Sequence, residues 1–272
     1  MAEAERQEVR RRRVLYIPGF DPVPARKYRE RYRKGGEEQA RISGYSLGIG
    51  PQRKGGFYGW SVEAEMAGQA VRSDVEVLVW ADIVKDSMGH GVLATYWQLV
   101  RTAWAYIGSG ALFRLMRLRK GPVIAALYPV VLLLGQLAVA VLAGAGAALI
   151  WMMISGWIFG PADFGFSPLF FTRAGMALVF GWVTVWLILR WFKRRDPWLA
   201  WYLMHDYAFS ARHGGAYPPA QEARMRDFAD RIAEVLAEEV DEVLVVGHSS
   251  GAYMAVSLLA DVIRSGRVPS SS

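Results

Sequence analysis

The sequence predicts an α/β fold in which a largely parallel sheet, with its helices, is interrupted by a two-helix transmembrane hairpin. Short apolar runs rich in β-branched residues occur near both ends of the 272-residue chain and predict strands. A segment with helical apolar spacing precedes the last of these runs, as in a strand–helix–strand unit. Between the two ends lies a long uncharged stretch, which is typical of a membrane span.

The strands of the sheet are predicted from three runs, which are residues 14–20, 75–82 and 243–247. Residues 43–50 and 57–66 are expected to form strands or loops, because glycine pairs interrupt the chain around them. Residues 222–239 carry apolar side chains at helical spacing and predict the crossover helix that leads into the last strand.

The last predicted strand runs into Gly247-His248-Ser249-Ser250-Gly251, followed by a helix-like run of small residues. This is a G-x-S-x-G sequence in the strand–turn–helix context in which a serine becomes a nucleophile. Gly247 and Gly251 are expected to permit a sharp turn where a Cβ would clash. The turn would lift the Ser249 hydroxyl out of the sheet edge and direct the backbone N–H of Ser250 at the same space. The alternative is an ordinary strand–helix turn.

This motif resembles the nucleophile elbow of the α/β-hydrolase superfamily, and the first strand ends in a compatible sequence. Pro18-Gly19-Phe20 stands where the family often has His-Gly-x, a loop that supplies a backbone N–H to the oxyanion hole. The resemblance implies that Ser249 attacks an ester carbonyl while the N–H groups of Phe20 and Ser250 hold the oxyanion. A simple Pro-Gly turn is the alternative for this loop. No cofactor or metal is expected.

The triad acid and base that the resemblance implies are absent from their expected positions. In the family both follow the serine along the chain, but here Asp261 is the only acid after Ser249 and no histidine follows. Asp261 is expected to point away from the site, because it falls within the next helix. His248 is expected to turn aside, and His205 and His213 remain alternatives for the base. We therefore interpret the sequence as a C-terminally truncated fragment.

The transmembrane hairpin is predicted at residues 121–193, with spans at about 122–155 and 171–192. No charged residue occurs between Gly121 and Ala162, a run longer than the roughly 20 residues that a span needs. A break near Gly144-Ala145-Gly146 would give three crossings and place the two parts of the sheet on opposite sides of the membrane. Two crossings are therefore predicted.

The charges around the hairpin predict its orientation. Basic residues flank both ends, whereas the connecting loop at 161–172 carries only Asp163 before Arg173. By the positive-inside rule, the flanks and the hydrolase domain face the cytoplasm, and we expect a bacterial inner membrane. The net charge of +7 arises from such basic clusters, and anionic lipid headgroups are the expected partner. Nucleic acid is not expected, because no basic face with base-reading or stacking groups is apparent.

The predicted domain order is a disordered basic arm (1–13), the first part of the hydrolase domain (14–120), the hairpin (121–193) and the second part with the elbow (194–272). The predicted function is that of a membrane-anchored serine hydrolase, esterase- or lipase-like, acting on ester or acyl substrates. The alternative is a non-catalytic membrane protein that retains a hydrolase-like fold as a binding or scaffold module.

Overall fold

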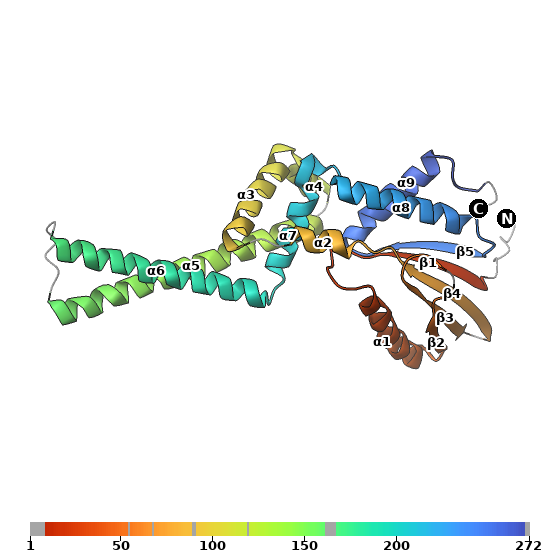
Figure 1. The fold of residues 1–272 in the computed structure, drawn as a ribbon, viewed down its shortest axis with the longest axis horizontal. Helices are drawn as coiled ribbons and strands as arrows, with labels where there is room; N and C mark the ends of the chain where they lie inside the picture. Colours follow the sequence, from red (N-terminus) through yellow and green to blue (C-terminus); the bar gives the residue numbers. More distant parts are fainter. Residues whose placement is uncertain are drawn as a thin grey trace. The chain divides into compact units, whose positions relative to one another are not determined.

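The computed structural model describes residues 9–53, 55–66, 68–88, 91–118, 120–160 and 167–269. The chain divides into two compact units, which we call the sheet unit and the helical unit (Figure 1). The sheet unit comprises residues 1–88 and 217–272, and the helical unit comprises residues 89–216.

The sheet unit contains a five-stranded sheet in the order β2-β3-β4-β1-β5. Its strands are β1 (Arg11–Ile17), β2 (Ser46–Pro51), β3 (Gly59–Met66), β4 (Gln69–Val77) and β5 (Glu242–Gly247). β1 pairs in parallel with β4 and β5, whereas the β2–β3 and β3–β4 pairs are antiparallel. The α/β class is confirmed, and the predicted parallel sheet is corrected to a mixed one. Only residues 67 and 68 separate β3 from β4, and so short a connection joins antiparallel strands.

Some strands start earlier than the sequence predicted. The run predicted at 75–82 starts at Gln69 and gives way to helix α2 (Ala81–Ser87) after Val77. β1 starts at Arg11, inside the predicted basic arm, whose residues 1–8 lie outside the described residues. Arg13 belongs to the sheet because its guanidinium is buried and lies 3.1 Å from the buried carboxylate of Glu76 on β4.

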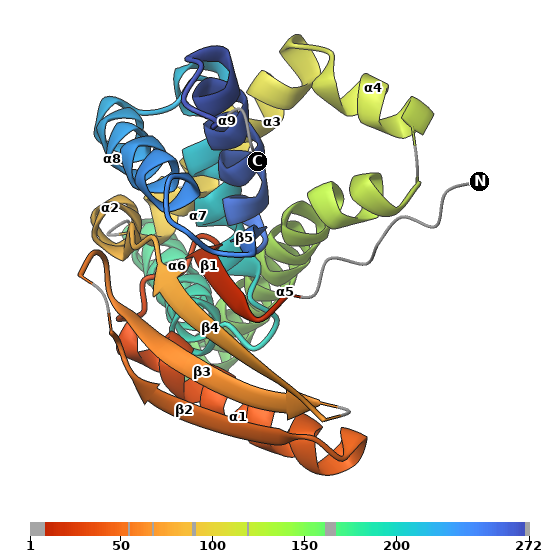
Figure 2. The ribbon, with the colours of Figure 1, turned by 90° about the vertical axis from the view of Figure 1, so that its right-hand side faces the viewer.

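Helices cover both faces of the sheet (Figure 2). α1 (Arg26–Ser43) packs on one face, where Tyr28 joins a buried cluster with Trp60 and Val75. α8 (Pro219–Leu236) and α9 (Ser250–Arg264) lie on the other face. The chain thus runs from α8 through β5 into α9, which is the crossover order that the sequence predicted.

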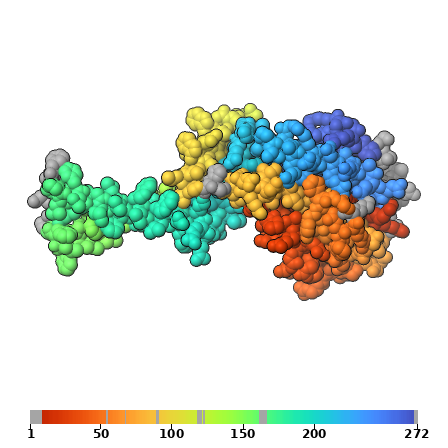
Figure 3. Space-filling view, in the orientation of Figure 1, coloured from red at the N-terminus to blue at the C-terminus, as the bar shows by residue number. Residues whose placement is uncertain are grey.

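The helical unit is built around two long helices, α5 (Lys120–Phe159) and α6 (Pro168–Arg195). Both are long and apolar enough to span a membrane, over residues 123–159 and 168–195. Figure 3 shows the two helices packed along each other, with their outer surfaces uncovered on the face that it displays. α5 is one continuous helix, so the chain does not break at Gly144-Ala145-Gly146.

Gly144 instead lies where the two long helices pack closely against each other. A Cβ on Gly144 would lie 2.7 Å from the Gly181 carbonyl oxygen, and one on Gly181 would lie 3.1 Å from the Gly144 carbonyl oxygen. Small residues allow two helix backbones to approach in this way inside a bilayer. Further along the pair, the rings of Trp151 and Phe180 lie in contact at a tilt, with centroids 4.8 Å apart.

Three shorter helices and a 3-10 turn belong to the helical unit and not to the sheet unit. They are α3 (Val92–Gly108), α4 (Ala111–Leu118), α7 (Ala200–Ser210) and η1 (Arg212–Gly215). α3 and α7 bury apolar side chains against α5 and α6, and Tyr96 donates a hydrogen bond to the Leu133 carbonyl at 2.9 Å. The boundaries between the two compact units therefore lie near residues 88 and 217. The sequence predicted domain boundaries near residues 120 and 194.

Candidate nucleophile elbow

Ser249 occupies a tight turn between β5, which ends at Gly247, and α9, which begins at Ser250. Its backbone is strained, with φ 52° and ψ −122°. A non-glycine residue in such a sparsely populated conformation costs on the order of 1–3 kcal/mol and persists only when its surroundings enforce it. The strand–turn–helix arrangement that the sequence predicted around Ser249 is therefore present.

The two glycines that flank this turn have no room for a side chain. A Cβ on Gly247 would lie 2.6 Å from the Gly251 carbonyl oxygen and from the Cα of Ala252. A Cβ on Gly251 would collide with the Ile17 carbonyl oxygen and lie 2.7 Å from the Pro18 carbonyl oxygen. The close approach of α9 to the end of β1 thus requires glycine at both positions.

The loop after β1 lies directly beside the elbow. β1 and β5 are parallel neighbours, with Ile17 opposite Gly247, so both loops leave the sheet at the same edge. A Cβ on Gly19 would lie 3.0 Å from the Cβ and 3.6 Å from the Oγ of Ser249. The peptide groups that follow Gly19 and Ser249 carry the N–H groups of Phe20 and Ser250, the two expected oxyanion donors.

Buried aromatic residues hold the Pro18-Gly19-Phe20 loop in place. The indole N–H of Trp80 donates a hydrogen bond to the Pro18 carbonyl at 2.8 Å, and the Phe20 ring packs edge-on against Trp80 with centroids 6.1 Å apart. Both aromatic side chains are almost completely buried. Sequence reasoning assigned Trp80 to a strand and missed this role. No local signal marks this role, because the partner Pro18 lies 62 residues earlier in the chain.

The elbow hydroxyl is exposed, and no described acid or histidine side chain lies within hydrogen-bond distance of Ser249 Oγ. His248 is turned aside, as expected, and stacks on Tyr16 with ring centroids 6.4 Å apart. Asp261 lies in α9, exposed to solvent, and faces Arg264 at 3.6 Å. It follows Ser250 by three helical turns, so it lies far along the helix from the elbow.

The other histidines belong to different parts of the chain. His205 is buried in α7, where its Nδ1 lies 3.1 Å from the Gln98 amide oxygen. His213 lies in η1 of the same helical unit. His90 lies outside the described residues. The sheet unit thus supplies the serine and the two loops of the predicted site, while a base beside the serine remains a prediction.

One further carboxylate lies where the sheet's parallel strands end. Asp82, at the start of α2, receives two hydrogen bonds from Arg224 of α8, at 3.1 and 2.7 Å, and the same guanidinium donates to the Val79 carbonyl. These bonds hold the pKa of Asp82 below its ordinary value. The Arg224 side chain therefore connects α8 to Asp82 and to the segment that follows β4. Within the described residues, no group of three or more potential ligands could hold a metal ion.

We find no protein family, no curated protein and no solved structure that matches this chain. The α/β-hydrolase likeness accordingly rests on the elbow and the Pro-Gly-Phe loop alone.

Proposed function

We propose that the protein is a membrane-anchored serine hydrolase that uses Ser249 as a nucleophile on ester or acyl substrates. The observation that carries this proposal is the strained, exposed Ser249 beside Gly19, in a turn whose two glycines admit no side chain. Backbone strain of this kind lowers the stability of the fold, and strained residues are concentrated at functional sites.

In the proposed reaction, Ser249 Oγ attacks the substrate carbonyl and forms an acyl-enzyme that water then hydrolyses. The N–H groups of Phe20 and Ser250 would stabilise the oxyanion of each tetrahedral intermediate. The reaction also needs a base that takes the Ser249 proton, which the part of the sheet unit that the structure describes does not place beside Ser249. The Trp80 hydrogen bond to Pro18 supports the proposal because it fixes the loop that carries one donor.

The hairpin of α5 and α6 would hold this hydrolase domain at the inner membrane of a bacterium. The last turn of α6 carries Lys193, Arg194 and Arg195, which favours a cytoplasmic position for that end. Ester or acyl groups of membrane lipids are then substrates within reach of an anchored enzyme.

The alternative is a non-catalytic module that retains the elbow as part of a binding surface. The absence of a described acid or histidine beside Ser249 Oγ favours it.

Fluorophosphonate labelling distinguishes the two. In membranes of the source cell, which contain the natural gene product, the probe should modify Ser249, identified by mass spectrometry of the labelled peptide. Labelling should disappear in Ser249→Ala and persist in Ser46→Ala, which removes an exposed hydroxyl on β2. An unlabelled wild-type protein that is correctly inserted would refute the nucleophile and favour the binding module.

A further inference from the structure

One side of α3 exposes a continuous row of large apolar side chains. The row consists of Leu93, Trp97, Val100, Trp104 and Ile107, each more than half exposed. Their spacing of three and four residues places them on one face of the helix, while Val92 and Leu99 are buried on another. Water-soluble proteins rarely expose two tryptophans and three aliphatic side chains together to solvent. This face is therefore expected to bind a partner or a lipid surface.

α3 starts beside the basic end of the hairpin. Gly91 and Val92 line a cavity of about 540 Å³ together with Trp186, Arg190 and Lys193 of α6. Aromatic and basic side chains gather in this way where a membrane helix leaves the hydrocarbon region. From there α3 runs across the long axis of α5 and α6 (Figures 1 and 2). An apolar-faced helix in this position would lie along the plane of the membrane surface.

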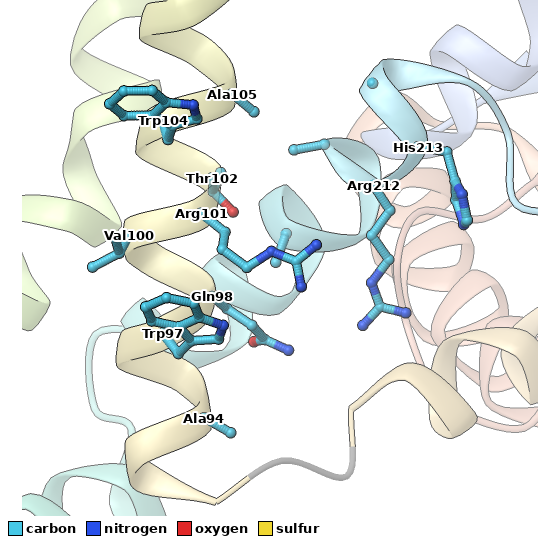
Figure 4. Close-up of a pocket in the computed structure, with 13 residues that line it drawn as sticks. Ala94, Trp97, Gln98, Val100, Arg101, Thr102, Trp104, Ala105, Arg212 and His213 are labelled. Atoms are coloured by element: carbon cyan, nitrogen blue, oxygen red, sulfur yellow. The ribbon is translucent and has the colours of Figure 1, made fainter.

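A basic pocket of about 990 Å³ adjoins the exposed row, between α3 and the end of α7 with η1. In Figure 4 the side chains of Arg101 and Arg212 extend into the same space, and Trp97 and Trp104 of the exposed row also line the pocket. Neither arginine has an acidic partner among the described residues. The Arg212 guanidinium stands over the Phe209 ring at 5.8 Å, which leaves its N–H groups available.

Two unpaired guanidinium groups that share one pocket favour an anion between them, and the planar fork of arginine suits a phosphate. Gln98 lines the same pocket, and since its amide oxygen lies 3.1 Å from His205 Nδ1, its NH2 group remains as a donor. The exposed apolar row on the same helix favours an anion that is attached to a hydrocarbon.

We infer that α3 and the α7–η1 turn form a binding site for an anionic phospholipid at the membrane surface. The Trp97–Trp104 face enters the acyl region, and the headgroup phosphate lies between Arg101 and Arg212. This inference rests on the part of the proposed function in which the hairpin spans the membrane, and it is independent of the chemistry of Ser249.

The position of α3 is tested with spin labels on single cysteines, since the chain has no cysteine of its own. A label at Val100→Cys in lipid nanodiscs should be reached by oxygen and not by a water-soluble nickel complex. Leu142→Cys on α5 and Ile42→Cys on α1, both exposed, are the lipid and water references. The inference is overturned if the label at position 100 is as accessible to the nickel complex as the label at position 42, while the label at position 142 is accessible only to oxygen. A Leu142 label in water overturns the membrane anchor as well.

The phosphate site is tested by thermal unfolding of the detergent-solubilised protein with added phosphatidylglycerol, phosphatidylcholine or inorganic phosphate. Phosphatidylglycerol should raise Tm most, because a ligand that binds only the native state stabilises it. Arg101→Gln/Arg212→Gln should bind this lipid about tenfold more weakly.

The matched control is Arg114→Gln/Arg117→Gln, which removes the same charge from the neighbouring helix α4. It should retain nearly all of the stabilisation by phosphatidylglycerol. Equal losses in the two double variants would show a general charge effect and overturn the site. Equal stabilisation by inorganic phosphate would overturn the lipid as its ligand.

Discussion

At the scale of single residues, Glu76 is the most constrained charge in the sheet unit. Its side chain is 2% exposed and accepts hydrogen bonds from Arg13 at 3.1 Å, from Arg231 at 2.9 Å and from the Phe57 backbone N–H at 2.9 Å. Glu76→Gln should destabilise the fold by about 3–5 kcal/mol, because it removes the buried carboxylate that two guanidinium groups share, and the remaining partners, Glu234 and Glu238, are more exposed. Chemical denaturation monitored by tryptophan fluorescence measures this loss.

The matched control is Glu63→Gln on β3. Glu63 also pairs with two arginines, Arg53 and Arg72, but its side chain is 59% exposed. Solvent screens such pairs, so this variant should unfold at nearly the wild-type denaturant concentration. If both variants lose the same free energy of unfolding, the contribution of the Glu76 network to stability does not depend on its burial.

A second prediction for a single residue concerns acid. The pKa of Asp82 is lowered in the folded state, chiefly by its hydrogen bonds with Arg224. The pair therefore stabilises the fold above the unfolded pKa of about 3.8, and this contribution disappears as pH falls through the lower folded pKa. Because the Asp82 side chain is 58% exposed, the contribution is at most about 1 kcal/mol.

The measurement is the difference in stability between the wild type and Asp82→Asn as a function of pH. The difference should be largest near neutral pH and should shrink below pH 3.8. A difference that stays constant down to the lowest pH at which the protein folds would contradict the role of this pair.

At the scale of elements, the crossing of α5 and α6 leaves no room for a side chain at Gly144. Gly144→Leu should separate the helices and cost about 1–3 kcal/mol, because a Cβ there meets the Gly181 carbonyl and lies 2.6 Å from Val185 Cγ2. Pulsed electron resonance between labels at Ile150→Cys and Leu178→Cys measures the separation. Gly135→Leu, on the same helix with nothing within 4 Å, is the control and should leave the distance unchanged.

The same glycine shows where local sequence patterns are sufficient and where they are not. The composition of the middle of the chain predicted two apolar helices. This prediction is possible from local sequence alone, because the hydropathy of a span depends only on consecutive residues. The sequence pattern suggested only a possible break at Gly144, and its contact with Gly181 could not be predicted because the two glycines are far apart along the chain. Arg13 is comparable, since its charge suggested a solvated arm and only the distant Glu76 accounts for its burial. By contrast, the turn at Ser249 was predictable, because its glycines and flanking strand are contiguous.

At the scale of the whole molecule, the sheet constrains how the proposed hairpin can cross a membrane. β1 precedes the hairpin and β5 follows it, yet the two are hydrogen-bonded parallel neighbours, with Val14 opposite Leu244. A sheet held together by these bonds cannot be divided by a bilayer. If the hairpin spans a membrane, its two ends must therefore lie on one side, which requires an even number of crossings and fits the two candidate spans.

This yields a topology prediction that needs only single cysteines. An impermeant maleimide applied to intact bacterial spheroplasts should label Ser167→Cys, at the start of α6, and should not label Ile42→Cys on α1 or Val268→Cys after α9. In inverted vesicles the pattern should reverse, because the positive-inside rule predicts that the basic flanks place both sheet segments in the cytoplasm. Labels at Ile42 and Val268 on opposite sides would be incompatible with the β1–β5 pairing. Ile42, Val268 and Ser167 all on one side would mean that the hairpin does not cross the membrane.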